Sequence, residues 1–292
     1  MKVLVTGATG RVGRSLLLHK PSDVDVEVLL SPVSQQLEGY AWYRTDIADY
    51  EKTRMAVTCA DPDVVVHLAA FTDVDECENV PDMAFKFNCD GAANIAKSCA
   101  ECGAKLVFIS TDHVFDGISG PYTEDDRPNP VNVYGRSKLE GEQAAAEHAD
   151  KLLIVRIAVV FGKRIEGTRH NFVSWLIEQF QSGNTVNAWN DQYTTPAYLE
   201  ELTRVLWKLI DKNSTGIIHY GTSDMLSRYE MAINVCKTMG FSEGLVMSVS
   251  FSDVNLIAKR PLISGFVTDK VHEILNMPPV SFANALFHMT ET

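Results

Sequence analysis

A tyrosine and a lysine four positions apart are the residues of this sequence with the clearest chemical potential. Tyr134 and Lys138 occur in the run VYGRSK. At helical spacing they share one face, where the ammonium would stabilise a phenolate and so help the tyrosine to exchange a proton with a carbonyl compound. By itself such a pair also fits an ordinary surface helix. Thr111, in the run STD at the end of an expected strand, adds a hydroxyl able to polarise the same carbonyl. The three residues together favour acid–base catalysis.

A glycine-rich segment near the N-terminus predicts a phosphate-binding turn. In VTGATGRVG, Gly7 permits a tight turn, Gly10 allows close approach to a pyrophosphate, and Gly13 allows close packing of helix on strand. The helix N-terminus adds free N–H groups. Turn glycines without a ligand are the alternative, but the position after the first strand of a βαβ pattern favours a dinucleotide site. The expected cofactor contacts here are Gly7, Thr9, Gly10, Arg11, Val12 and Gly13.

The end of the second expected strand bears on which nicotinamide cofactor is bound. NAD sites often place an acid there for the ribose hydroxyls, whereas this strand ends in Ser31 and Pro32. Arg11 directly follows Gly10 and is suited to pair with a ribose phosphate. The competing interpretation of Arg11 is a solvated surface charge. We therefore expect NADP(H) as the preferred cofactor, with NAD(H) as the alternative.

Short β-rich runs alternate with amphipathic segments in the first half of the chain. Strands are expected near residues 2–6, 26–30, 64–68, 105–110 and 152–157, and helices near 12–18, 50–60, 81–101 and 134–149. This alternation, with nearly continuous apolar strands, predicts an α/β fold with a doubly wound parallel sheet of the Rossmann type. Ligands of such a sheet lie at the carboxyl ends of its strands.

The pattern becomes less regular after Phe161. Helices are expected near residues 171–181, 197–210 and 228–239, with a strand near 216–220. We expect a dinucleotide-binding Rossmann domain at 1–161 and a smaller, discontinuously packed substrate-binding region at 162–292. A cleft between the two would hold the substrate.

Composition excludes several classes of function. The 292 residues are 46% hydrophobic and 22% charged, as in ordinary globular proteins, and the net charge of −12 argues against nucleic-acid binding. No apolar run is long enough for a membrane span, and the chain enters a strand without a signal peptide, so we expect a cytoplasmic protein. Cys99 and Cys102 form a CxxC without a second pair, which favours small buried residues over redox chemistry or a zinc site. We expect no metal.

Motifs spread over nearly the whole chain resemble those of dTDP-4-dehydrorhamnose reductases, a family of extended short-chain dehydrogenases/reductases. The stretch from Ser110 to Glu142 is the most specific part, because it combines several independent motifs. In chain order the matching segments are the three glycines, HLAA at 67–70, STDHVFDG at 110–117, PY at 121–122, YGRSK at 134–138, GE at 141–142 and RP at 260–261.

The resemblance implies a role for each catalytic candidate. Tyr134 would donate a proton to the substrate oxygen, Lys138 would tune it and hold the nicotinamide ribose, and Thr111 would bind the carbonyl oxygen. The nicotinamide would supply the hydride, and the substrate would be the 4-keto group of a nucleotide-linked 6-deoxyhexose. The other cofactor contacts it implies are Asp46 and Ile47 at the adenine, and Ala69 and Ala70 at the pyrophosphate and ribose.

Five further residues are candidates from the same resemblance. Asn88 would order a proton relay next to the cofactor, with a purely structural amide as the equal alternative. Arg260 would contact the substrate diphosphate in bidentate fashion, and a structural salt bridge is its competitor. The remaining substrate candidates are Thr72, Val74 and His113.

Two departures leave the exact sugar open. His113 stands where this family usually has tyrosine, and the segment 157–161 lacks a tryptophan that many such reductases carry. The chain also resembles methionine adenosyltransferase regulatory beta subunits, which bind NADP and act by interaction. A nucleotide-sugar epimerase or dehydratase is the third interpretation, since a fold does not fix a function. A homodimer is the assembly we expect first.

Overall fold

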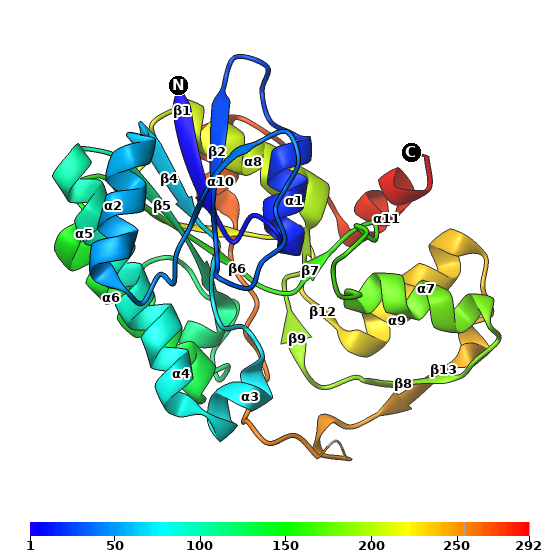
Figure 1. Cartoon of the computed structure of the whole chain (residues 1–292). Coiled ribbons are helices and arrows are strands. Elements are labelled where there is room, and N and C mark those ends of the chain that lie inside the picture. Colours follow the sequence, from blue (N-terminus) through cyan, green and yellow to red (C-terminus); the bar gives the residue numbers. More distant parts are fainter. Residues whose placement is uncertain (254, 292) are drawn as a thin grey trace.

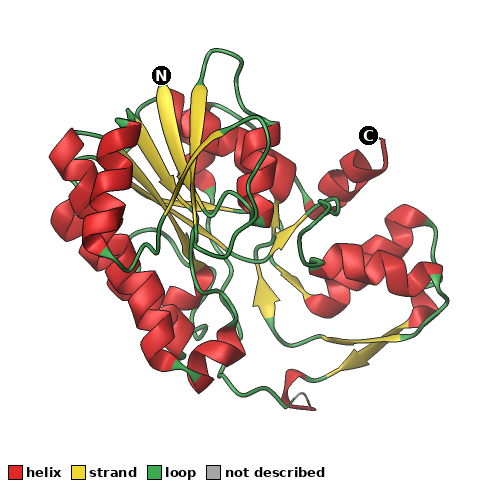
Figure 2. Ribbon diagram, in the orientation of Figure 1, coloured by secondary structure: helices red, strands yellow, loops and turns green. Residues whose placement is uncertain are grey.

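The computed structural model describes residues 1–253 and 255–291, and its centre is a seven-stranded parallel sheet with helices on both faces (Figures 1 and 2). The strand order is β11-β6-β5-β4-β1-β2-β3. This is the doubly wound α/β fold predicted from the sequence. The strands are β1 (Lys2–Thr6), β2 (Asp25–Leu30), β3 (Ala41–Arg44), β4 (Val64–His67), β5 (Lys105–Thr111), β6 (Leu152–Ile157) and β11 (Gly216–Tyr220).

The strand order reverses beside β1, which pairs with both β2 and β4. In doubly wound sheets such a reversal opens a crevice at the carboxyl ends of the strands. Thr6 and His67 are register partners at that edge, and the Thr6 Oγ1 lies 2.7 Å from the His67 Nδ1. The same hydroxyl accepts hydrogen bonds from the backbone N–H groups of Leu68 and Ala69. It therefore fixes the chain that leaves β4 against the chain that leaves β1.

Two apolar layers hold the helices on the sheet. One layer contains side chains of α1 (Arg11–Leu18), α8 (Leu199–Asp211) and α10 (Asp269–Leu275). The other contains side chains of α2 (Tyr50–Ala60), α5 (Gly91–Cys102) and α6 (Val133–His148), the group at the left of Figure 1. Every residue of β4 and β5 is buried, as expected for strands covered on both faces.

A smaller body carries its own apolar core beside the sheet. It contains α7 (Phe172–Gln181), α9 (Arg228–Met239) and α11 (Phe282–Glu291), at the right of Figure 1. Its short strands pair as β7 with β10, β9 with β12 and β8 with β13. Their bounds are β7 (Val160–Phe161), β8 (Val186–Trp189), β9 (Tyr193–Thr194), β10 (Ala197–Tyr198), β12 (Leu226–Ser227) and β13 (Val246–Val249).

The chain passes between these two bodies more than once. After β10 it returns to the sheet, where α8 packs on one face and β11 pairs with β6. The division at residue 161 stays a prediction, and the substrate-binding region it describes contributes two helices, α8 and α10, and one strand, β11, to the sheet and its covering layer.

One expected helix is interrupted. In place of an unbroken helix near 81–101, α4 (Pro81–Phe85) leads into a π-helical turn (Lys86–Asp90) and then into α5. The shorter elements that complete the description are α3 (Val74–Asn79) and the 3₁₀ turns Asp112–Val114, Glu243–Leu245 and Phe251–Asp253.

Candidate active site

The three catalytic candidates meet at the carboxyl end of β5. Thr111 is the last residue of β5, and Tyr134 and Lys138 lie in the first turns of α6. The buried Asn132 caps α6 by accepting a hydrogen bond of 2.7 Å from the Gly135 N–H, which fixes the helix start and with it the Tyr134 backbone. The Thr111 side chain lies close enough to the Tyr134 phenol to lower its pKa, against the larger opposite effect of burial. The structure therefore brings together a phenol and a hydroxyl that sequence reasoning assigned to one carbonyl.

Burial makes both titratable groups favour their neutral forms. It raises the pKa of Tyr134 well above its usual value, against the opposing effect of the Thr111 side chain. It lowers the pKa of Lys138 to about 8, although the Glu142 carboxylate acts in the other direction. The Lys138 Nζ donates a hydrogen bond of 2.7 Å to the Ile109 carbonyl and lies 4.1 Å from the centre of the Phe108 ring. One ammonium hydrogen is thus committed to the protein.

A buried ion pair stands behind Lys138 on the same helix. Arg156 donates two hydrogen bonds to the Glu142 carboxylate, at 2.9 and 2.6 Å, and both side chains are almost fully buried. His219 lies 3.4 Å from the third guanidinium nitrogen and next to the Tyr122 carbonyl. Removing one partner of such a pair leaves a buried charge, at a cost of about 3–5 kcal/mol. The pair holds α6 against β6 and keeps a negative charge one turn from Lys138.

The glycine turn after β1 fits a dinucleotide in its geometry. Gly7 has φ +67°, and a Cβ there would lie 2.6 Å from the Ala69 N. A Cβ on Gly13 would lie 2.5 Å from the Gly7 carbonyl oxygen. A side chain at Gly7 would collide with the chain that leaves β4, and one at Gly13 would push α1 away from the turn. Both positions must therefore be glycine for the turn and the N-terminus of α1 to keep this arrangement. Arg11 and Val12 begin that helix.

Arg11 lies across the entrance of this turn. Its guanidinium donates to the Arg169 carbonyl at 2.8 Å and to the Val160 carbonyl at 3.5 Å, and burial lowers its pKa. Both partners are backbone carbonyls, so the charge itself is not neutralised by them. The interpretation as a freely solvated surface charge does not describe this side chain. Its contact with a ribose phosphate stays a prediction. Thr9 lies in the same turn, and its carbonyl accepts a hydrogen bond from Arg14.

The adenine candidates lie beyond β3, where the chain turns into α2. The Asp46 carboxylate accepts a hydrogen bond from the Ala48 N–H and forms an ion pair of 3.8 Å with Lys86. Ile47 packs on Gly91, the first residue of α5. Ala69 and Ala70 are half-buried in the segment after β4. All four positions follow the carboxyl ends of strands in the parallel sheet, Asp46 and Ile47 after β3 and Ala69 and Ala70 after β4.

Asn88 is fully occupied by the protein. It lies in the π-helical turn, and its side chain accepts from the Phe71 N–H at 2.7 Å and donates to the Phe71 carbonyl and the Ser137 hydroxyl. These hydrogen bonds agree with the alternative that Asn88 is a structural amide. Because they join the segment after β4 to α6 between Tyr134 and Lys138, Asn88 also fixes two walls of the site. Its part in a proton relay stays a prediction.

The substrate candidates differ in how far their side chains are already engaged by other residues of the protein. His113 packs edge-on against Tyr134, with ring centres 5.4 Å apart, and its Nδ1 lies 3.0 Å from the Asn132 amide. Thr72 is exposed and Val74 half-buried at the start of α3. Arg260 forms an ion pair of 3.0 Å with Asp75 and donates to the Ala258 carbonyl. The structural salt bridge considered for Arg260 is therefore present.

Sequence reasoning gave no role to Asp112, although it lies inside the STD motif. The buried carboxylate accepts hydrogen bonds from Ser264 at 2.6 Å, Thr194 at 3.3 Å and Thr111 at 3.2 Å. Thr194 lies in β9 of the smaller body, and the Ser264 N–H donates a hydrogen bond to the Tyr193 carbonyl in the same strand. Asp112 therefore joins β9 and its neighbouring chain to β5 beside Thr111. Thr194 and Ser264 lie 82 and 152 positions from Asp112 in the sequence, so no local sequence pattern reveals these contacts.

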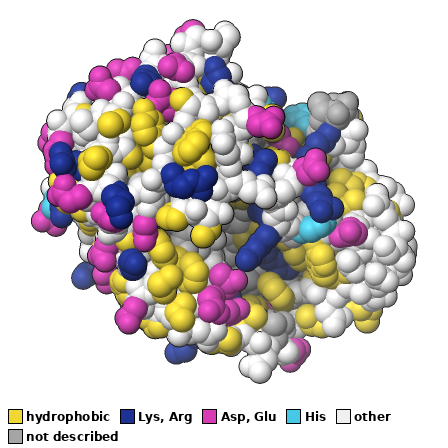
Figure 3. Space-filling view, viewed as in Figure 1, with side chains coloured by type: hydrophobic (Ala, Val, Ile, Leu, Met, Phe, Trp, Pro, Cys, Tyr) yellow, Lys and Arg dark blue, Asp and Glu magenta, His cyan; other side chains and the backbone are white. Residues whose placement is uncertain are grey.

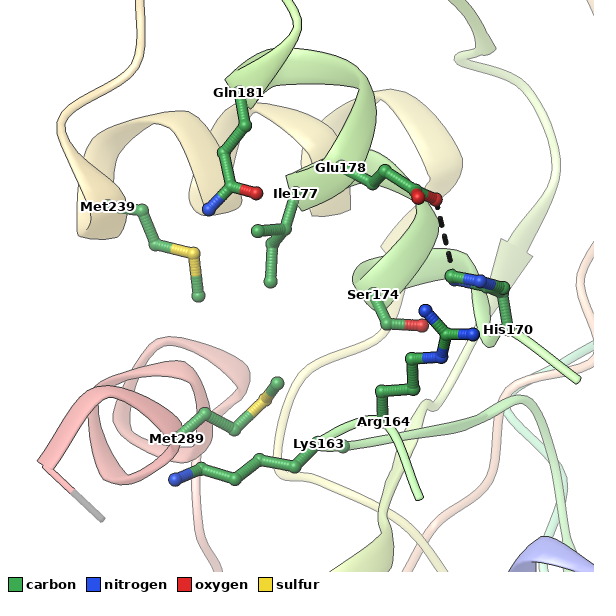
Figure 4. A pocket seen from close by; sticks show the side chains of 10 residues that line it. Lys163, Arg164, His170, Ser174, Ile177, Glu178, Gln181, Met239 and Met289 are labelled. Carbon is green, nitrogen blue, oxygen red and sulfur yellow. Dashed lines mark ion pairs between the residues drawn. The ribbon is translucent and has the colours of Figure 1, made fainter. Parts of the chain in front are cut away.

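A separate pocket of about 400 Å³ opens beside α7 (Figure 4). Met239, Met289 and Ile177 supply apolar side chains to it, the Lys163 side chain extends beside Met289, and Arg164 lies near Ser174 and His170. None of the predicted catalytic, cofactor or substrate residues lines it, so it does not contribute to the chemistry described above.

Metal and membrane functions find no support in the described residues. Within 1–253 and 255–291 no cluster of three or more His, Cys, Asp or Glu side chains is arranged to hold a metal ion. In the same residues no helix combines the length and apolar character of a membrane span. Cys99 is buried, which raises the pKa of its thiol far above its usual value, in agreement with a structural CxxC.

Comparison with known proteins places the chain in a family. Residues 1–292 match the RmlD substrate binding domain. The chain belongs to this family. A solved dTDP-4-dehydrorhamnose reductase from Bacillus anthracis, in complex with NADP, has a TM-score of 0.86 and 29% identity, covering 100% of this chain and 99% of that one.

Two groups of curated relatives resemble this RmlD family member to a similar extent. A dTDP-4-dehydrorhamnose reductase from Mycolicibacterium smegmatis is 33% identical over 242 residues, covering 82% of this chain and 69% of the relative. The methionine adenosyltransferase 2 subunit beta from Bos taurus is 29% identical over 282 residues, covering 89% and 78%. The family is thus an extended short-chain dehydrogenase/reductase family, and both resemblances found in the sequence are confirmed.

Proposed function

We propose that this protein is an NADP(H)-dependent reductase of the 4-keto group of a nucleotide-linked 6-deoxyhexose. The observation that carries the proposal is the joint placement of Thr111, Tyr134 and Lys138 at the carboxyl end of β5, next to the glycine turn of β1. The similarity to reductases over the full length of the chain supports the substrate class.

In the proposed reaction Tyr134 protonates the substrate oxygen while Thr111 donates a hydrogen bond to it. Lys138 keeps one hydrogen on the Ile109 carbonyl. Its other hydrogens would serve the nicotinamide ribose and the tyrosine. When bound, the nicotinamide supplies the hydride. The deep burial of Lys138 strengthens its effect on the phenol, because charges interact more strongly where water is excluded.

The cofactor would lie along the crevice between β1 and β4. Gly7, Gly10 and Gly13 would face the pyrophosphate, Ala69 and Ala70 the ribose, and Asp46 and Ile47 the adenine. Arg11 would meet the ribose phosphate, which favours NADP(H), and NAD(H) is the alternative cofactor. We further propose that the protein acts in the cytoplasm and as a homodimer. Residues 162–292 would form the substrate-binding region, and Thr72, Val74, His113 and Arg260 would contact the nucleotide sugar.

An assay with purified protein tests this function. NADPH should be consumed when a dTDP-linked 4-keto-6-deoxyhexose is added, in one-to-one proportion with the alcohol formed. Related 4-keto sugars on other nucleotides belong in the panel, because His113 departs from the usual residue. Absence of NADPH oxidation with every member of the panel would overturn the proposal.

A second function is favoured by the similarity to methionine adenosyltransferase subunits. In that case the chain would bind NADP and regulate a methionine adenosyltransferase by association. Size-exclusion chromatography of the two proteins with NADPH distinguishes the cases. A stable complex without any reductase activity would establish the regulatory role.

A further inference from the structure

Arg228 is a partly exposed cation to which the proposed reaction gives no role. It is the first residue of α9, directly after the N-cap Ser227. Its guanidinium carbon lies 4.7 Å from the Phe172 ring centre and 6.0 Å from that of Trp189. Part of the side chain remains exposed. Burial lowers the pKa of Arg228 to about 10, against the opposing charge of Asp112, and the Arg228 charge adds to the effect of burial in lowering the pKa of His113. Arg228 therefore lies near Asp112 and His113, the two residues that follow Thr111 in the chain.

The charge of Arg228 is not neutralised by an ion pair within the described residues. Among the described residues no carboxylate forms an ion pair with it, and its one hydrogen bond is a 3.9 Å contact with the Met231 sulfur. Asp112, the nearest acid, is already engaged by three hydroxyl groups. A cation in the first turn of a helix also opposes the helix dipole. Such an arginine retains almost its whole set of donors for a ligand.

Arg260 makes a direct contrast. Asp75 neutralises it at 3.0 Å, and the Ala258 carbonyl takes a further hydrogen. An anion at Arg260 would also meet the Asp75 carboxylate. The unpaired guanidinium between two aromatic rings is the better receptor, because a planar fork held in place binds phosphate oxygens in bidentate fashion with little loss of freedom.

We propose that Arg228, rather than Arg260, is the principal contact for the diphosphate of the nucleotide-linked substrate. This inference rests on the proposed function for the identity of the substrate, and it assigns the anion site to the Phe172, Trp189 and Arg228 cluster. Figure 3 shows basic side chains along the hollow between the two bodies on one face of the molecule, as an anionic ligand requires.

Binding of a nucleoside diphosphate without turnover tests the assignment. Isothermal titration of the NADPH-loaded protein with dTDP, and separately with thymidine, isolates the contribution of the phosphates. Arg228→Met should weaken dTDP binding by about 10- to 100-fold and leave thymidine binding unchanged. Arg228→Lys should keep part of the affinity. Arg260→Met should cost much less, and Lys237→Met, an exposed residue at the other end of α9, should cost nothing.

The outcomes separate this inference from the proposed function. Equal dTDP affinity in Arg228→Met and wild type, or a larger loss in Arg260→Met, overturns the assignment while leaving the reductase intact. Failure of the wild type to bind dTDP, UDP or GDP removes the nucleotide-sugar function itself. Far-UV circular dichroism and NADPH titration establish that each variant is folded, and the Arg228→Lys protein provides the comparison if Arg228→Met is not.

Discussion

At the residue scale, the main property of the site is the burial of its two titratable side chains away from water. Tyr134 and Lys138 are both shifted by burial towards their neutral forms, so neither is poised by its own chemistry alone. In the proposed mechanism the charge of Lys138 assists proton transfer by Tyr134. Bound substrate and cofactor complete the surroundings of both side chains. This coupling gives two predictions that concern single side chains.

Tyr134→Phe removes the acidic hydroxyl and hardly any volume. We expect turnover to fall about a hundredfold or more, because the proton for the substrate oxygen has lost its donor, while NADPH affinity changes little. Steady-state kinetics and NADPH titration measure the two effects. Tyr40→Phe, far from the site beside α1, provides the matched control. Unchanged turnover in the Tyr134 variant would exclude the tyrosine from the mechanism.

The Lys138 pKa sets the expected pH dependence. Burial places this pKa at about 8, so the ammonium form predominates below that pH and is lost above it. Because the charged form assists the tyrosine, kcat/KM for reduction should be level on the acid side and fall as the pH rises through about 8. A pH profile over roughly two units on each side measures this. A profile that is flat across that range would show that the lysine charge is not required.

At the element scale, the end of β5 and the start of α6 position the three catalytic candidates. The strands covered on both faces were predictable, because their apolar runs are nearly continuous. β3 was not predicted, since three of its four residues are exposed and carry no burial pattern. The π-helical turn at Asn88 also escaped prediction, because it is fixed by contacts with Phe71 and Ser137 rather than by local sequence. The sequence shows an arginine at position 228, but it does not show that no carboxylate among the described residues forms an ion pair with it.

Arg11, the first residue of α1, is the residue expected to determine the preference for NADPH over NADH. Arg11→Ala should weaken NADPH binding by about tenfold and NADH binding much less, because only NADPH has the extra phosphate for the guanidinium. Titration of both cofactors against both proteins gives the ratio. Lys20→Ala, just beyond the other end of α1, serves as the control. If both cofactors lose affinity equally, Arg11 acts only by holding the Val160 and Arg169 carbonyls.

At the scale of the whole molecule, two buried histidines link folding to pH. Burial lowers the pKa of His67 and of His219 to about 3, helped by Lys138 and Arg156 respectively. Both stay neutral in the folded protein, whereas the unfolded chain takes up protons below the ordinary histidine pKa of 6.5. Their contribution to stability is therefore complete above that pH and is lost as the pH falls towards 3.

Urea unfolding at a series of pH values checks this linkage. The free energy of unfolding should decrease below pH 6.5 by roughly 1.4 kcal/mol per pH unit for each histidine. His219→Gln should reduce that slope by about one histidine, whatever it does to the stability at neutral pH. An unaltered slope in this variant would show that His219 does not drive acid unfolding.

The central claim is that two bodies of one chain enclose a site for hydride transfer to a nucleotide-linked keto sugar. The most direct measurement is isotope transfer, with NADPH deuterated at both positions of its reactive carbon, purified protein and a dTDP-4-keto-6-deoxyhexose. Mass spectrometry of the sugar product should show one deuterium bound to carbon, matched by one NADP⁺ per product molecule. A sugar that is epimerised or unchanged, free of deuterium, with the NADPH recovered intact, would contradict the account.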